Sequence, residues 1–159
     1  MTHVDKIAVD VTTKNVSDAG TNGLVYLGIG GREFRLDKPG DQFKRGVTDT
    51  FTIGIGSDVE SSDINDLPLD PGPNGKSPEI EDSVVTGTNI FPVYIRLDPK
   101  NDEDNDWNVE KVKVDAVAGF GTGSGATRTF VFPKPTGGHP EGTIWLGMNS
   151  GLTLFLEQQ

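Results

Sequence analysis

Apolar and polar residues alternate with a period of two along most of the chain. In KIAVDVTT, for example, Ile7, Val9 and Val11 fall on one face. No window keeps an apolar period of 3.6 residues long enough for a substantial helix. Short alternating strands separated by Gly, Pro and Asn predict an all-β fold, an antiparallel β-sandwich or barrel. The other predicted strands are LVYLGIG, REFRLD, TDTFTIGI, FPVYIRL, WNVEKVKVDAVA, RTFVF, TIWLG and LTLFL.

Two acidic segments interrupt this strand pattern. Residues 57–82 hold eight acidic residues and one lysine among Pro, Ser and Gly, which predicts a long solvated loop. Residues 98–106 hold five more acids, so these two segments carry thirteen of the twenty-four acidic residues. The glycine-rich stretch AGFGTGSGAT predicts a flexible hairpin connection, because the Lys-Ser/Thr ending and the following helix of a phosphate-binding loop are missing.

Composition narrows the classes of function. The 159 residues suit one domain, and their net charge of −10 disfavours nucleic acid as a partner. Without cysteine, the chain has neither disulfides nor a thiol nucleophile, and the two histidines, His3 and His139, leave little basis for a triad. A nucleophile elbow of the G-x-S-x-G type, between a strand and a helix, does not occur either. We therefore expect no enzyme.

The chain shows neither a signal peptide nor a membrane-spanning segment. MTHVDKIAVD has no apolar core or basic run, and no stretch reaches about twenty apolar residues. We expect a soluble protein, with its compartment and oligomeric state left open.

Two loops supply oxygens suited to a hard cation. SDAGTNG, residues 17–23, follows the first strand, and DNDW, residues 104–107, precedes a later one. Calcium binds six to eight oxygens from carboxylates, amides and carbonyls on loops. The spacing does not match an EF-hand, and Asp and Asn are also favoured turn residues that bond their own backbone. Composition therefore leaves a calcium site and ordinary turns both open.

Four motifs in order resemble the PLAT domain, the lipoxygenase-homology β-sandwich. They are AGTNGLVYLGIGG, FRLDKPGDQFKRGVTDTFTI, PVYIRL and DNDWNVEKVKVDA, and TIWLG is similar to a late strand of the family. The resemblance implies an antiparallel sandwich of about eight strands, formed by a stand-alone member covering residues 1–159. Residues 56–89 stand where relatives have a much shorter link, which implies a long acidic insertion that binds a partner or is inert.

Such domains bring an enzyme to lipid or to a partner protein, often with calcium on loops at one end. Carried over by residue, the motif positions of the family's first calcium site are Gly20, Asn22 and Asp106. Additional candidate ligands are Asp18, Asp104 and Asn105. A second site would use Asp41, but Lys44 stands where an acid is expected and opposes metal binding, so we expect none.

The resemblance also assigns structural roles around these loops. Arg45, Gly46 and Asp49 form a turn that packs against the following strand, while Phe43, Phe51 and Trp107 enter the core. Lipid-binding relatives expose aromatic residues here, but this chain offers Ser17, Asp18 and the acids of residues 102–104. Val16 is the one apolar residue that we expect on these loops.

The function implied is non-catalytic binding. A calcium ion would stiffen one end of the sandwich, which would then contact a lipid or protein surface. Two alternatives stay open: a protein-interaction adaptor that needs no calcium, and a carbohydrate-binding or enzymatic domain.

Overall fold

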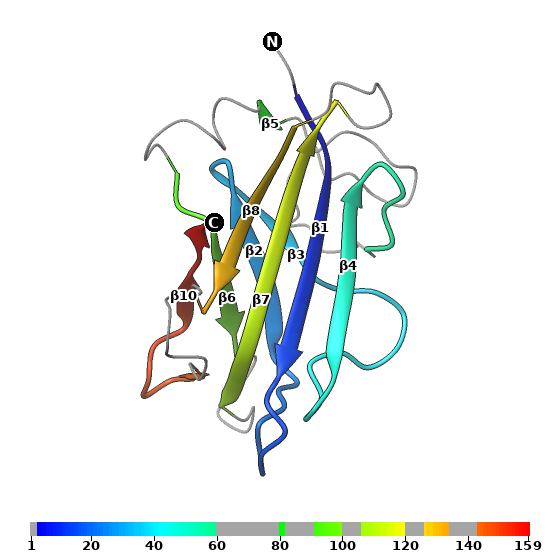
Figure 1. The fold of residues 1–159 in the computed structure, drawn as a ribbon. Helices are drawn as coiled ribbons and strands as arrows, with labels where there is room; N and C mark the ends of the chain where they lie inside the picture. The colour runs from blue at the N-terminus through cyan, green and yellow to red at the C-terminus, as the bar shows by residue number, and fades with distance from the viewer. Residues whose placement is uncertain (1–2, 60–79, 82–90, 100–105, 120–125, 134–142) are drawn as a thin grey trace.

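The chain forms two antiparallel sheets (Figure 1). The computed structural model describes residues 3–59, 80–81, 91–99, 106–119, 126–133 and 143–159. The strands are β1 His3–Thr13, β2 Leu24–Ile29, β3 Arg32–Arg35, β4 Thr48–Gly54, β5 Ile80–Glu81, β6 Tyr94–Asp98, β7 Trp107–Ala118, β8 Ala126–Phe132, β9 Ile144–Leu146, β10 Thr153–Phe155 and β11 Glu157–Gln158.

The first sheet has the order β11-β8-β7-β1-β4, with β5 paired to β1 and β9 paired to β7. The second sheet has the order β10-β6-β2-β3. We call them sheet A and sheet B. The predicted all-β antiparallel sandwich is confirmed, and each predicted segment contains a strand. The two-residue strands β5 and β11 were not predicted from the sequence.

The longest ladder joins β1 to β7 at the centre of sheet A. Val9 pairs with Val114, and the side chains of both are fully buried. Alternate residues of both strands point to sheet B, because successive side chains of a strand point to opposite faces. The period-two pattern of the sequence therefore forms the inner surface of the sandwich.

Three aromatic rings close the core near one end. Phe43 stacks on Phe51 with ring centroids 5.7 Å apart, and it meets Trp107 edge-on at 5.2 Å. All three side chains are buried, which confirms the prediction for them. The Trp107 indole Nε1 donates a hydrogen bond to Thr13 Oγ1 at 2.9 Å, so its polar atom is satisfied inside the core.

The turn between Phe43 and Asp49 is fixed by a buried carboxylate. Phe43 has φ 59°, a left-handed conformation that bulky residues rarely adopt. Its backbone N–H donates to Asp49 Oδ2 at 2.8 Å, and Asp49 is buried. Gly46 also has a positive φ, 72°, as its place in this turn requires. The structural roles expected for Gly46 and Asp49 agree with this geometry.

Residues 56–89, which the resemblance predicts to be an acidic insertion, lie mostly outside the described residues. The first residues of this segment fold back on β4, because Asp58 accepts a hydrogen bond from the Thr52 N–H at 2.7 Å and Val59 is buried in the core. Strand β5 also belongs to this segment, so the prediction of a loop throughout residues 57–82 is wrong at Ile80 and Glu81. Among the described residues, no helix is long and apolar enough to cross a membrane.

Candidate functional site

The 14–23 loop and the start of β7 lie side by side at one end of the sandwich, the lower end in Figure 1. The Lys14 N–H donates to the Asn108 carbonyl at 3.0 Å, and the Asn108 N–H donates to the Ala19 carbonyl at 2.9 Å. The structure thus brings together the two segments from which the calcium ligands were predicted. We call this end the rim and define it by residues 14–23, 43–47, 106–108 and 145–151.

Asp18 stands at the tip of a tight turn on the rim. The Ala19 N–H donates to the Val16 carbonyl at 3.3 Å, and Asp18 has φ 58°, which Asp tolerates better than most residues. Its side chain is exposed. Gly20 follows in close contact with the next loop, since a Cβ there would lie 3.0 Å from the Phe43 carbonyl oxygen. A glycine at this position lets the two loops meet.

The amide oxygen of Asn22 already has a cationic partner. Lys44 Nζ donates to Asn22 Oδ1 at 2.9 Å. The neighbouring Arg45 Nε donates to Asn15 Oδ1 at 3.0 Å. Each of the two adjacent cations therefore joins the 43–47 turn to the 14–23 loop. For calcium to bind Asn22 Oδ1, the Lys44 ammonium would have to move away, since like charges repel at such distances.

Asp106 lies against the turn that follows β9. A Cβ added at Gly147 would collide with Asp106 Oδ1, so the carboxylate rests on the glycine backbone. The turn is closed by hydrogen bonds from the Ser150 and Gly151 N–H groups to the Gly147 carbonyl. Asp106 is exposed. The predicted ligands Asp104 and Asn105 lie outside the described residues.

Asn108 has a buried oxygen without a partner. Its Oδ1 is buried and accepts no hydrogen bond within the part of the chain that the structure describes. Such an atom costs about 1–3 kcal/mol of stability unless a ligand or water satisfies it. The sequence offered no signal for this residue, because an Asn close to an acidic loop is most simply interpreted as a turn residue.

The rim also presents apolar side chains that sequence reasoning missed. Trp145 and Met148, on either side of Gly147, are 39% and 65% exposed, and Val47 is 42% exposed. These residues lie outside the two loops for which Val16 was the one apolar residue expected, so that expectation did not cover them. Trp145 pairs with Asn108 in the β7–β9 ladder, and this register turns its ring away from the core, while that of Trp107 faces inward.

A polar cavity of about 160 Å³ opens beside the rim. Arg35 and Asp37 form an ion pair at 3.2 Å on its wall, and Lys44 with Asn22 closes one side. Asp41, considered for a second calcium site, also lines it. The remaining lining residues are Thr21, Gly23, Leu24, Val25, Leu36, Gly40, Gln42 and Phe43.

The described rim residues fit a calcium ion in part. Asp18 and Asp106 have exposed carboxylates on segments that backbone hydrogen bonds join, and Asn108 Oδ1 is a further oxygen, which is buried; a hard cation prefers oxygens of these kinds. Asn22 offers an oxygen that Lys44 occupies. No group of three or more His, Cys, Asp or Glu suited to a metal occurs among the described residues. The ligand set therefore stays a prediction.

Comparison with known proteins supports the fold. No protein-family model matches the sequence, and no curated protein does. A lipoxygenase (LOX) variant is similar over 97% of this chain and 16% of its own, with 15% identity and a TM-score of 0.50. The alpha toxin from Clostridium absonum is similar over 97% of this chain and 31% of its own, with 22% identity and a TM-score of 0.51. The chain thus spans less than a third of either protein and shares with both a β-sandwich fold.

Proposed function

We propose that residues 1–159 form one non-catalytic module that docks on a lipid surface through the rim, with a calcium ion held there. The observation that carries the proposal is the exposure of Trp145, in β9, and of Met148, on the following turn, against which the Asp106 carboxylate lies. An apolar pair thus stands next to an acidic group suited to calcium.

The apolar pair supplies an anchor. Full burial of a large apolar side chain stabilises by about 1.5–3 kcal/mol, and Trp is favoured at the membrane–water interface. Met148 at 65% exposure and Trp145 at 39% have area left to bury. This answers the main objection from the sequence, which was the lack of an apolar group on the loops.

The acids set the depth of docking. A carboxylate at the bilayer centre costs roughly 2.5–3.5 kcal/mol, so Asp18 and Asp106 must stay at the level of the headgroups. A calcium ion on these oxygens would neutralise them and take further oxygens from lipid phosphates. The exposed cations Lys44 and Arg45 would add attraction to anionic headgroups, about 1 kcal/mol each near such a surface.

The absence of catalysis is part of the proposal. At the rim, the described residues pair no hydroxyl nucleophile with a histidine. The chemistry on this end is binding chemistry, namely oxygens, cations and an apolar turn. Turnover on a panel of lipid esters by the purified chain would contradict this part.

Sedimentation with vesicles tests the docking. The chain should pellet with phosphatidylserine–phosphatidylcholine vesicles in calcium and stay in the supernatant with chelator. Met148→Asp should abolish pelleting. The control is Ile55→Asp, which should still pellet, because the Ile55 N–H donates to the Asp5 carbonyl at the opposite end of β1 from the rim. Ile55 is as exposed as Trp145. Equal pelleting of both variants would refute docking through the rim.

Fluorescence locates the contact. The chain has two tryptophans, of which Trp107 is fully buried and Trp145 is exposed. A blue shift on vesicle binding should therefore disappear in Trp145→Phe. Specific capture of a protein partner that persists in chelator, together with no vesicle binding, would favour the protein adaptor instead.

A further inference from the structure

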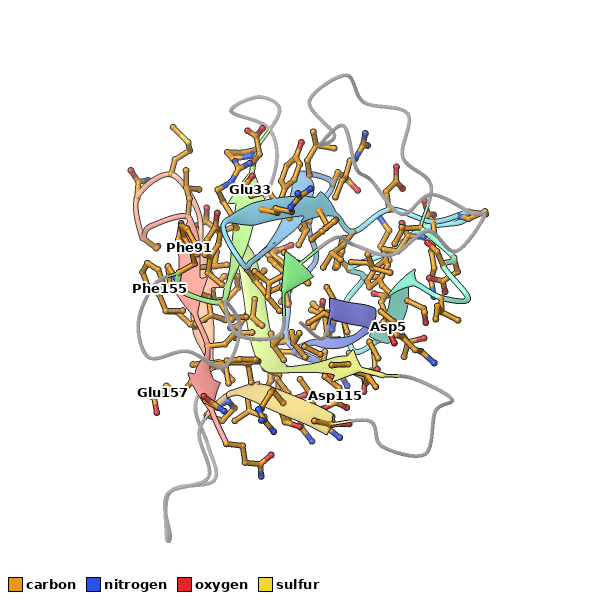
Figure 2. All side chains as sticks on the ribbon, turned by 90° about the horizontal axis from the view of Figure 1, so that it is seen from above. Asp5, Glu33, Phe91, Asp115, Phe155 and Glu157 are labelled. Carbon is orange, nitrogen blue, oxygen red and sulfur yellow. The ribbon has the colours of Figure 1, made fainter. Side chains whose placement is uncertain are left out.

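The solvent face of sheet B carries a second surface, which lies on strands, whereas the rim consists mainly of loops. Phe155 on β10 pairs with Tyr94 on β6, which pairs with Gly28 on β2, which pairs with Glu33 on β3. Because residues in one row of a sheet point to the same face, these side chains share one side. Figure 2 shows Glu33, Phe91 and Phe155 on one side of the molecule and Asp115, from sheet A, on the opposite side.

Two aromatic rings of this surface lie flat on glycine backbone. A Cβ at Gly28 would collide with three atoms of the Tyr94 ring. At Gly31, three atoms of the Phe91 ring would lie 3.1 to 3.2 Å from such a Cβ. Near-equal distances to three ring atoms mean that the ring meets the backbone with its face, so the other face of Phe91 points outward.

Exposed aromatic area extends across the row. Phe155 is 61% exposed and Phe91 47% exposed, and the Phe155 and Tyr94 rings meet edge-on at 6.1 Å. Isolated exposed apolar residues need no explanation, but three aromatic rings on one sheet face form a patch. At the β3 edge of the sheet the row ends in Glu33, which pairs with Arg96 of a neighbouring row on the same face.

The charged groups are a fixed pair. Arg96 donates from Nη2 to Glu33 Oε2 at 2.7 Å and from Nε to Glu33 Oε1 at 3.0 Å, and the Tyr94 hydroxyl donates to Glu33 Oε1 at 2.7 Å. The guanidinium lies over the Tyr26 ring, 4.4 Å from its centroid. Bidentate pairing and stacking hold both charges in place.

This pair keeps its hydrogen-bonding capacity toward solvent. The side chains of Glu33 and Arg96 are each 33% exposed. The hydrogen bond from Arg96 lowers the pKa of Glu33, so its carboxylate is ionised at neutral pH and remains an acceptor. Arg96 has five N–H donors, and within the described parts of the chain two of them donate, both to Glu33.

We propose that this surface, the aromatic platform of Phe91, Tyr94, Phe155, Glu33 and Arg96, binds an uncharged glycan chain of pyranose units. The C–H bonds on one face of a pyranose ring carry partial positive charge and pack on the negative face of an aromatic ring. Its hydroxyl groups both donate and accept, as the exposed edge of the Glu33–Arg96 pair requires. Binding sites of this composition, aromatic area with a few fixed polar groups, are typical of small polar ligands.

The charges of the platform favour an uncharged polar ligand over a lipid or a nucleic acid. The two charges of the platform cancel each other, which suits an uncharged partner. A lipid tail would have to desolvate the ion pair, which costs more than the contact returns. Nucleic acid is repelled by a chain of net charge −10. A sugar chain can hydrogen-bond to the ion pair through its hydroxyl groups and pack its C–H groups on the aromatic rings.

Titration of the whole chain with cellohexaose, xylohexaose, mannohexaose and chitohexaose, followed by amide NMR shifts and calorimetry, tests the proposal. At least one oligosaccharide should bind with a dissociation constant near or below about 1 mM and shift the amides of Gly28, Gly31 and Phe155. No binding of any of the four at about 10 mM, or shifts confined to other residues, would overturn it.

Variants separate the platform from other exposed apolar residues. Phe155→Ala should weaken binding at least about tenfold, and Met148→Ala, with similar exposure at the rim, should leave it unchanged. Glu33→Gln, which keeps the shape but removes the charge, should also weaken it. Equal affinity for Phe155→Ala and the unsubstituted chain would refute the site. Capture of a protein through the platform, with no response to sugar, would do so too.

Discussion

The Lys44 ammonium lies 2.9 Å from Asn22 Oδ1, the amide oxygen that the family resemblance assigns to calcium. The chain thus has its own cation at this position, and the hydrogen bond links two loops that a metal ion would otherwise link. The pair of cations in FKRGVTDTF, which is unexpected in so acidic a chain, is explained in the same way, because Arg45 bonds to Asn15 on the same loop.

Removing this internal cation should strengthen calcium binding. In Lys44→Met, Asn22 Oδ1 is released and a like charge is lost, so calcium affinity should rise about tenfold, roughly 1.4 kcal/mol. Calorimetric titration with calcium measures it. The matched control is Arg45→Met, which loses a similar hydrogen bond to Asn15 that involves no proposed ligand. Equal affinity in both variants would show that Lys44 does not compete with the ion.

Asp106 should carry the thermal effect of calcium. A ligand at a hundred times its dissociation constant stabilises the folded state by about 2.7 kcal/mol, which a melting curve resolves. Asp106→Ala should remove the difference in Tm between calcium and chelator. Asp10→Ala, an exposed acid in the middle of β1, should keep it. A difference that survives in Asp106→Ala rejects this residue as a ligand.

Asp49 should contribute more to the free energy of unfolding than an exposed aspartate does. Asp49→Ala leaves the buried Phe43 N–H without its acceptor and releases a turn held at positive φ, so unfolding should become easier by about 1.5–3 kcal/mol. Urea unfolding measures the change. Asp49→Asn, which keeps an acceptor oxygen, should recover a good part of the loss. If both substitutions cost the same, the charge and not the hydrogen bond fixes the turn.

The Tyr94 phenol should lose its proton only at high pH. Burial, together with the hydrogen bond to the Glu33 carboxylate, raises the pKa of Tyr94 to about 12. Because the pKa is raised on folding, the stabilisation is complete below about pH 10, the ordinary value, and is lost as pH rises through 12. Ultraviolet titration should show a phenolate transition near 12 that Tyr94→Phe removes. Glu33→Gln should bring it to lower pH.

The order and extent of the strands could be predicted because nearly every strand has one buried face. WNVEKVKVDAVA matches β7 from its first to its last residue, since polar and apolar residues alternate over most of its length and acidic residues precede it. The burial of Phe43 and Trp107 followed from the motif order. Strand β5 was missed because two residues in an acidic segment carry no periodicity, and only β1 gives them a partner.

The candidate site could be predicted only as two loops that meet. Which oxygens are free depends on side-chain partners, and the bond between Lys44 and Asn22 joins residues that no spacing rule connects. The exposure of Trp145 depends on the register of β9 against β7, where a shift by one residue would bury it and expose Leu146. The sequence pattern of TIWLG fits either register.

The central ladder of sheet A has a consequence for biosynthesis. Strand β1 is synthesised well before its neighbour β7, which begins only at Trp107. The edge of β1 that faces β7 therefore stays unpaired until Val114 is made, although β4 can already pair with the other edge. Pairing between such distant parts of a chain is slow and leaves unpaired edges exposed meanwhile. A nascent chain stalled before β7 would therefore present an apolar strand with one side unfilled, and a chaperone that holds this strand during translation should raise the yield of folded protein.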